Sequence, residues 1–165
     1  MAKHSFFKST KRNGFTLIEV ILVMGIFAIL AGFTTINLLR PQQSADLNST
    51  TTTIIADIKQ QQARAILGET DGGPAAVVHG IYFENNKYTL FKGLTYSAAD
   101  PANFVVDLSS GLALGTTFAG SQVIFNLQSG EISGFAEGAN SVTLTSAGGQ
   151  SRTLTFNKYG VVDVN

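Results

Sequence analysis

The sequence predicts an α+β protein in which a long hydrophobic N-terminal helix packs on a C-terminal antiparallel β-sheet domain. Three observations lead to this prediction. Residues 20–33 contain no hydrogen-bonding side chain, residues 47–65 place apolar side chains at helical spacing, and the chain after Gly68 alternates apolar and polar residues between glycine-containing turns. The length of 165 residues fits one such domain with an appendage better than two independent domains.

The net charge of zero conceals an uneven distribution of charge along the chain. Residues 1–14 hold four basic side chains (Lys3, Lys8, Lys11 and Arg12) and no acid, so the rest of the chain carries more acids than bases. A basic head before an apolar run is typical of a secretory signal, and it predicts that the C-terminal body lies outside the cytoplasm. The absence of cysteine excludes disulfides and thiolate sites.

The apolar segment is long enough to cross a membrane as a helix. It runs from residue 20 to residue 39, which corresponds to about 30 Å of helix, roughly one bilayer core. A small-x-small cleavage site is missing, because Ile29 stands two positions before Ala31. Glu19 begins the segment with a carboxylate, which costs on the order of 3 kcal/mol at a helix centre and less near an end. We therefore expect Glu19 either to have a cationic partner or to cap the positive end of the helix.

The stretch Lys-Arg-Asn-Gly-Phe-Thr-Leu-Ile-Glu-Val at residues 11–20 resembles the processing and assembly motif of type IV prepilins and type II secretion pseudopilins. The resemblance implies that a prepilin peptidase cuts between Gly14 and Phe15 and methylates the new amino group of Phe15. It also implies that residues 15–40 stay on the mature protein, first as a membrane anchor and then as a filament core. The implied role of Glu19 is filament assembly, through the Phe15 amine of an adjacent subunit.

The resemblance further implies where the protein works and with what. The expected partners are the prepilin peptidase, other pilin or pseudopilin subunits and an inner-membrane assembly platform. Before assembly the chain would cross the cytoplasmic membrane once, with its C-terminal domain in the periplasm or at the cell surface. Residues 63–66 and two successive C-terminal hairpins look most like the H-type minor pseudopilins and FimT-like minor pilins.

Helical character is expected to continue beyond the apolar segment, over residues 41–68. Pro41 offers no N–H to the carbonyl of Asn37, which predicts a kink or local melting there. Beyond Pro41, mostly apolar residues recur at intervals of four and three, which predicts one buried face of a helix. Gly68 is in a suitable position to end this helix. Hydroxyl and β-branched residues make 49–53 a weak point of this helix. The predicted buried face consists of Leu47, Thr51, Ile54, Ile58, Gln61 and Ala65.

Residues 69–165 are predicted to form the β domain, a meander of about seven short antiparallel strands with one polar face. The segment 69–74 reads as a loop, and residues 84–86 as a tight turn between the first two strands. We expect the helix that ends at Gly68 to cover the apolar face of the sheet. The predicted strands cover residues 76–83, 87–92, 104–108, 123–127, 142–144, 154–156 and 161–164.

No constellation of catalytic residues, cofactor motif or metal site is evident in the sequence. His4 lies in the leader, and His79 stands alone in a predicted strand, where an ordinary strand position is the preferred interpretation. Glu137 and Asp163 are single acids, better read as solvated loop or edge residues than as calcium ligands. We therefore expect a structural protein that is the substrate of an enzyme.

Two alternatives to a filament subunit stay open at this stage. One is a DNA-binding minor pilin of a competence pilus, which the charge disfavours because residues 42–165 carry six bases and ten acids. The other is an unrelated envelope binding module on a signal anchor. The mature N-terminus distinguishes the classes, because a methylated Phe15 supports a pilin, whereas an uncut Met1 or a start near Gly32 contradicts it.

Overall fold

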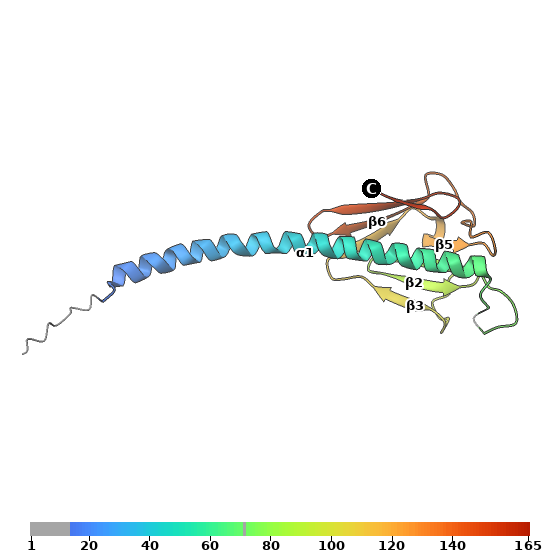
Figure 1. Ribbon diagram of the computed structural model, residues 1–165, viewed down its shortest axis with the longest axis horizontal. Helices are drawn as coiled ribbons and strands as arrows, with labels where there is room; N and C mark the ends of the chain where they lie inside the picture. Colours follow the sequence, from blue (N-terminus) through green and yellow to red (C-terminus); the bar gives the residue numbers. More distant parts are fainter. Residues whose placement is uncertain (1–13, 71) are drawn as a thin grey trace, which may run out of the picture. The chain divides into compact units, whose positions relative to one another are not determined.

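The computed structural model describes the backbone of residues 14–70 and 72–165, together with their side chains except those of residues 33–41. One long helix, α1 (Leu17–Leu67), is followed by strands β1 to β8, as Figure 1 shows. The chain divides into two compact units, of which the second comprises Arg40–Asn165. The predicted fold class, a helix packed with an antiparallel β-sheet domain, is confirmed.

The first half of α1 carries the apolar segment. The helical backbone continues through Pro41, so no loop interrupts α1 at that residue, and the kink there stays a prediction. The basic leader residues and His4 lie outside the described residues. Within the part of the chain that the structure describes, no helical stretch is both long and apolar enough to count as a membrane span.

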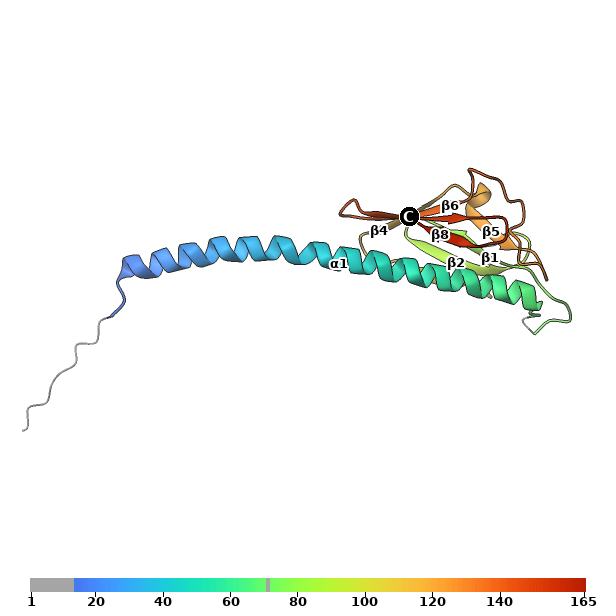
Figure 2. The same ribbon diagram turned by 45° about the horizontal axis from the view of Figure 1, so that its top comes forward.

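The β domain is built from two antiparallel four-stranded sheets, and the prediction of one meander is wrong. Sheet A has the strand order β3-β2-β1-β5, and sheet B the order β4-β6-β7-β8. In Figure 2, strands β4, β6 and β8 lie above β1 and β2. The strands are β1 (His79–Phe83), β2 (Lys87–Lys92), β3 (Phe104–Asp107), β4 (Leu112–Thr116), β5 (Gln122–Phe125), β6 (Ser141–Ser146), β7 (Ser151–Phe156) and β8 (Val162–Val164).

Strand β4 was not predicted from the sequence. It lacks β-branched residues before its last position, and Ala113 and Gly115 weaken its apolar alternation, so its local strand signal is poor. Pairing with β6 compensates, because Leu114 stands opposite Leu144 and both are buried. The segment therefore forms a strand because it pairs with a distant strand, β6. In sheet B, β4 is an edge strand.

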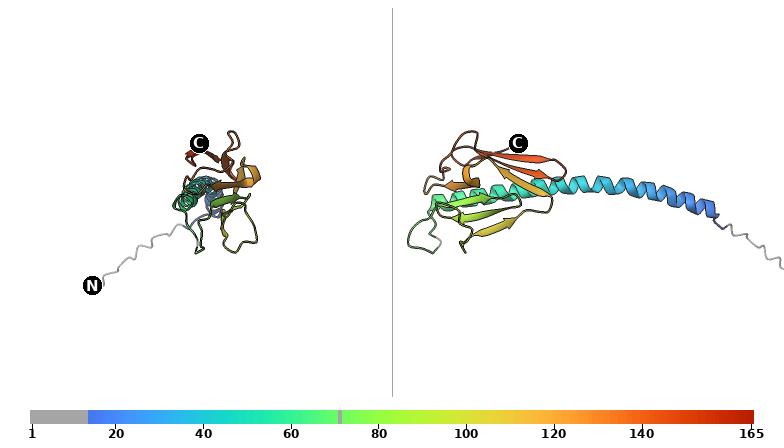
Figure 3. Two further views of the ribbon diagram at one scale, coloured as in Figure 1. Left: turned by 90° about the vertical axis from the view of Figure 1, so that its right-hand side faces the viewer. Right: turned by 180° about the vertical axis from the view of Figure 1, so that it is seen from behind.

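One hydrophobic core unites α1 with both sheets. All six residues of the predicted helix face are buried, with Ile54, Ile58 and Ala65 completely inaccessible, so this prediction is confirmed. The same core holds Phe125 of sheet A and Phe156 of sheet B, both essentially inaccessible. Figure 3, in its view from behind, shows the strands running alongside the green part of the helix.

The hydroxyl-rich run 49–53 forms part of α1 without a break. Three threonine hydroxyls donate to the carbonyl oxygens four residues earlier: Thr51 to Leu47 at 2.7 Å, Thr52 to Asn48 at 3.0 Å and Thr53 to Ser49 at 3.1 Å. These bonds satisfy the hydroxyls inside the helix instead of competing with it. Residues 49–53 are therefore helical despite their low helix propensity.

The helix ends at the predicted glycine. Gly68 adopts a left-handed backbone with φ of 64°, a conformation that favours glycine. The N–H of Glu69 donates to the carbonyl of Arg64 at 3.1 Å, and the N–H of Gly68 to that of Ala65 at 3.2 Å. This pair of bonds is the Schellman arrangement, which satisfies the last free carbonyls and turns the chain toward the β domain.

A buried tyrosine ties sheet A to the helix. Tyr88 of β2 is essentially inaccessible, and its hydroxyl donates to the carboxylate of Asp57 on α1 at 2.5 Å. Burial, together with the bond to the negatively charged Asp57, raises the pKa of the Tyr88 hydroxyl above its ordinary value. The phenol therefore stays protonated in the folded protein at pH values where the unfolded chain loses this proton.

This difference predicts a specific loss of stability in alkali. Below about pH 10 both states keep the Tyr88 proton, and above it the unfolded chain binds fewer protons, so the free energy of unfolding falls. Tyr88→Phe removes this contribution, and its stability should decline less steeply above pH 10 than that of the wild type in urea unfolding. Tyr159→Phe, which changes an exposed ring, is the matched control. Parallel pH profiles for wild type and Tyr88→Phe would contradict the assignment.

Candidate processing and assembly site

The start of α1 is fixed by a threonine cap. Thr16 immediately precedes the helix, and its hydroxyl oxygen accepts the N–H of Glu19 at 3.3 Å. The Thr16 carbonyl accepts from Glu19 at 3.1 Å and from Val20 at 3.2 Å. Threonine followed three residues later by glutamate is a capping-box sequence, and it satisfies N–H groups that a helix otherwise leaves free. The cap places Glu19 in the first turn, where its charge meets the positive end of the helix.

The predicted cleavage site lies just outside the helix. Gly14 and Phe15 precede the Thr16 cap, in chain without regular secondary structure. Both are exposed, and no atom of another segment would lie within 4 Å of a Cβ on Gly14. A peptidase needs an accessible, extended backbone around the bond that it cuts, which a helix does not offer. The Gly14–Phe15 bond is exposed and lies outside the helix.

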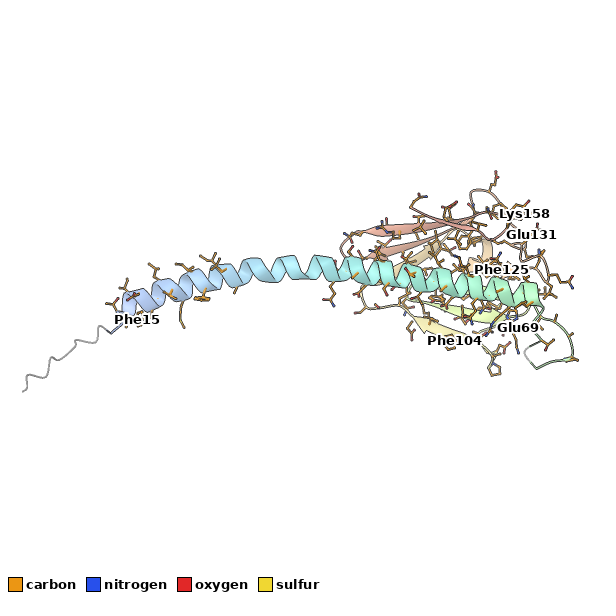
Figure 4. The ribbon with its side chains drawn as sticks, in the orientation of Figure 1. Phe15, Glu69, Phe104, Phe125, Glu131 and Lys158 are labelled. Atoms are coloured by element: carbon orange, nitrogen blue, oxygen red, sulfur yellow. The ribbon has the colours of Figure 1, made fainter. Side chains whose placement is uncertain are left out.

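The helix face that continues from this site is an exposed apolar surface. Phe15, labelled next to the start of α1 in Figure 4, is 83% exposed. Together with side chains up to about three turns further on it lines a groove of about 440 Å³, and Glu19 is one of the lining residues. The groove is lined by Phe15, Glu19, Val20, Val23, Met24 and Phe27. An apolar surface this continuous is typical of an interaction site.

Glu19 is the charged member of this groove. Among the described residues it forms no salt bridge, and its side chain is exposed. Its carboxylate is therefore available to a cation from another molecule, while its backbone N–H serves the Thr16 cap. The two expectations for Glu19, helix capping and pairing with a cation, use different atoms and are compatible.

The other sequence-predicted residues lie apart from this site. His79 is a buried residue of β1, and no group of three or more metal-ligating side chains occurs within residues 14–70 and 72–165. Glu137 is exposed in a loop, and Asp163 is exposed on β8. The side chain of Pro41 belongs to the range that the structure leaves undescribed.

Sequence reasoning missed two features that the structure brings out. The Thr16 cap could have been predicted from the sequence, because threonine and glutamate at positions 16 and 19 match the capping-box spacing. The second feature is a cavity between α1 and sheet A that contains Gln61. Its local signal was a polar residue at a position of the predicted buried helix face.

Comparison with known proteins supports the interpretation of the N-terminal segment. Residues 9–35 match the family model described as the prokaryotic N-terminal methylation motif, and this range contains Gly14, Phe15 and Glu19. Searches of curated proteins and of solved structures found no match. The motif supports a type IV pilin-like protein, and it implies processing by a prepilin peptidase and assembly with other pilins. Such proteins are structural and not enzymatic.

Proposed function

We propose that this chain is a minor pilin or pseudopilin, a structural subunit of a type IV pilus or type II secretion filament. The observation that carries the proposal is the arrangement of the N-terminal segment. The methylation motif, the accessible Gly14–Phe15 bond, the Thr16 cap and the exposed apolar helix face follow one another within a few turns. This order suits a chain that is cut just before a helix which then serves as anchor and filament core.

The subunit type and its location are part of the same proposal. The two antiparallel pairings β6·β7 and β7·β8 supply the successive C-terminal hairpins expected of H-type minor pseudopilins and FimT-like minor pilins. Before assembly the chain crosses the cytoplasmic membrane once, through residues 15–40, and its β domain lies outside the cytoplasm. The inner-membrane assembly platform then moves the subunit into the filament.

The mass of the mature N-terminus tests this function. In cells that contain a prepilin peptidase, the mature chain is expected to begin at a monomethylated Phe15 and to lack residues 1–14. Gly14→Val should abolish this cleavage, because a β-branched side chain then occupies the position next to the cut bond, and the full-length precursor should accumulate. Gly25→Val, a substitution inside α1 with equally open surroundings, is the control and should be cleaved normally. An uncut wild-type chain, or one that starts near Gly32, would contradict the proposal.

A further inference from the structure

The start of α1 lies close enough to the predicted cleavage site to control it. Leu17 is the first helical residue, and only Phe15 and Thr16 stand between it and Gly14. One helical turn takes about 3.6 residues, so a helix that began one turn earlier would enclose the Gly14–Phe15 bond. The residues on both sides of that bond would then have helical backbone angles instead of the extended ones that a peptidase needs. The residue at which the helix begins therefore decides whether the bond can be cut.

The sequence offers an earlier helix start that competes with the observed one. Asn13, which lies outside the described residues, directly precedes Gly14 in the chain. Asparagine is at least as good an N-cap as threonine. A helix that used Asn13 as its N-cap would have Gly14 and Phe15 as its first two residues. The structure has the later start, so an interaction near Leu17 must favour it.

Thr16 supplies this interaction. Its hydroxyl oxygen accepts the backbone N–H of Glu19 at 3.3 Å, a bond that belongs to the N-cap position and not to the helix interior. Inside a helix a threonine hydroxyl instead donates to the carbonyl four residues earlier, as the three threonines of residues 51–53 do. An earlier helix start would place Thr16 in the interior and break its bond to the Glu19 N–H. The cap therefore stabilises the start at Leu17 relative to an earlier one.

We propose that Thr16 is a positioning residue for cleavage, an inference that rests on the proposed function. Its cap holds the Gly14–Phe15 bond outside the helix, so that the peptidase can bind the backbone on both sides of the bond. Water then adds across the bond, which leaves a carboxylate on Gly14 and the free amino group of Phe15 that methylation requires. Thr16 takes no part in this chemistry and acts through the conformation of the chain. Loss of the cap lowers the fraction of chains that the peptidase can bind.

Cleavage of the full chain in detergent micelles by a purified prepilin peptidase tests the proposal. Thr16→Val keeps the shape of the side chain and removes the acceptor, so KM should rise about two- to fivefold at unchanged kcat. Thr16→Ser and Thr16→Asn supply other N-caps and should have the KM of the wild type. Thr52→Val, which removes an exposed hydroxyl further along α1, is the matched control and should be cut normally. Wild-type kinetics of Thr16→Val would overturn the proposal, and so would equal impairment of Thr16→Val and Thr16→Asn.

The Cα chemical shift of Phe15 reports the helix start without the peptidase. It should have a non-helical value in the wild type and in Thr16→Asn, and it should move toward the helical value in Thr16→Val. Slow cleavage of Thr16→Val with an unchanged Phe15 shift would mean that the peptidase contacts Thr16 directly, which overturns the proposal. An uncut wild-type chain contradicts the proposed function as well, whereas a wild-type chain cut at Phe15 with no shift change in Thr16→Val contradicts only the role of the cap.

Discussion

A Glu19→Ala variant is expected to be cleaved and methylated like the wild type and yet to enter filaments poorly. In a filament the carboxylate of Glu19 and the Phe15 amine of a neighbouring subunit would lie among apolar helices. Removing one member of such a pair leaves the other charge buried without compensation, which costs roughly 3 to 5 kcal/mol. The expected defect in incorporation is therefore 100-fold or more. It should be measured as the fraction of the variant that co-sediments with sheared filaments.

A second substitution separates assembly from helix capping. Glutamine is as acceptable as glutamate at the third position of a capping box, and the loss of charge at a helix start costs only about 0.3 to 1 kcal/mol. Glu19→Gln should thus keep the helix start and still assemble poorly, whereas Glu137→Ala, which removes an exposed loop acid, should assemble normally. The mass of each mature chain must confirm cleavage at Phe15. Normal incorporation of Glu19→Gln would assign Glu19 to capping alone.

The helix and its buried face could be predicted because their signals are local. Apolar residues at four-three spacing and a glycine in the position of a C-cap act within a few turns, and the structure has Leu47 and Ala65 buried and Gly68 in a left-handed conformation. The sheets depend on partners far away in the sequence. Residue 113 pairs with residue 145, and 81 with both 90 and 123, and no local pattern states which strands meet. The sequence pattern alone therefore does not distinguish a single meander from two separate sheets.

The candidate sites differ in the same way. Gly14, Phe15 and Glu19 could be proposed from the sequence because the motif is contiguous and its chemistry depends on sequence order. The cavity between α1 and sheet A was not predicted, because its polar and apolar walls come from α1, β2 and β3, and only the folded chain brings them together. Gln61 fits the helical period as well as a leucine would.

Gly80 and Gly115 form a pair of strand glycines with opposite expected effects. A Cβ on Gly80 would lie 2.6 Å from the carbonyl oxygen of Val123 and 2.7 Å from Cζ of Phe91, its cross-strand partner. The Phe91 ring cannot withdraw easily, because it meets Tyr96 edge to face with ring centroids 5.6 Å apart, and Tyr96 stacks on Tyr82 at 4.0 Å. Alanine at position 80 must therefore displace either sheet backbone or a packed aromatic cluster.

Gly80→Ala is expected to lower the free energy of unfolding by about 3 kcal/mol, the upper end of the usual cost of overpacking. Gly115→Ala on β4 meets no other segment within 4 Å and requires no left-handed backbone, so it should raise stability by about 0.5 to 1 kcal/mol through the entropy of the unfolded chain. Urea unfolding followed by circular dichroism compares the two variants. A loss of stability in both would mean that glycine is needed for strand flexibility in general. A loss in Gly80→Ala alone assigns the cost to the close approach of β1, β2 and β5, on which the packing of sheet A depends.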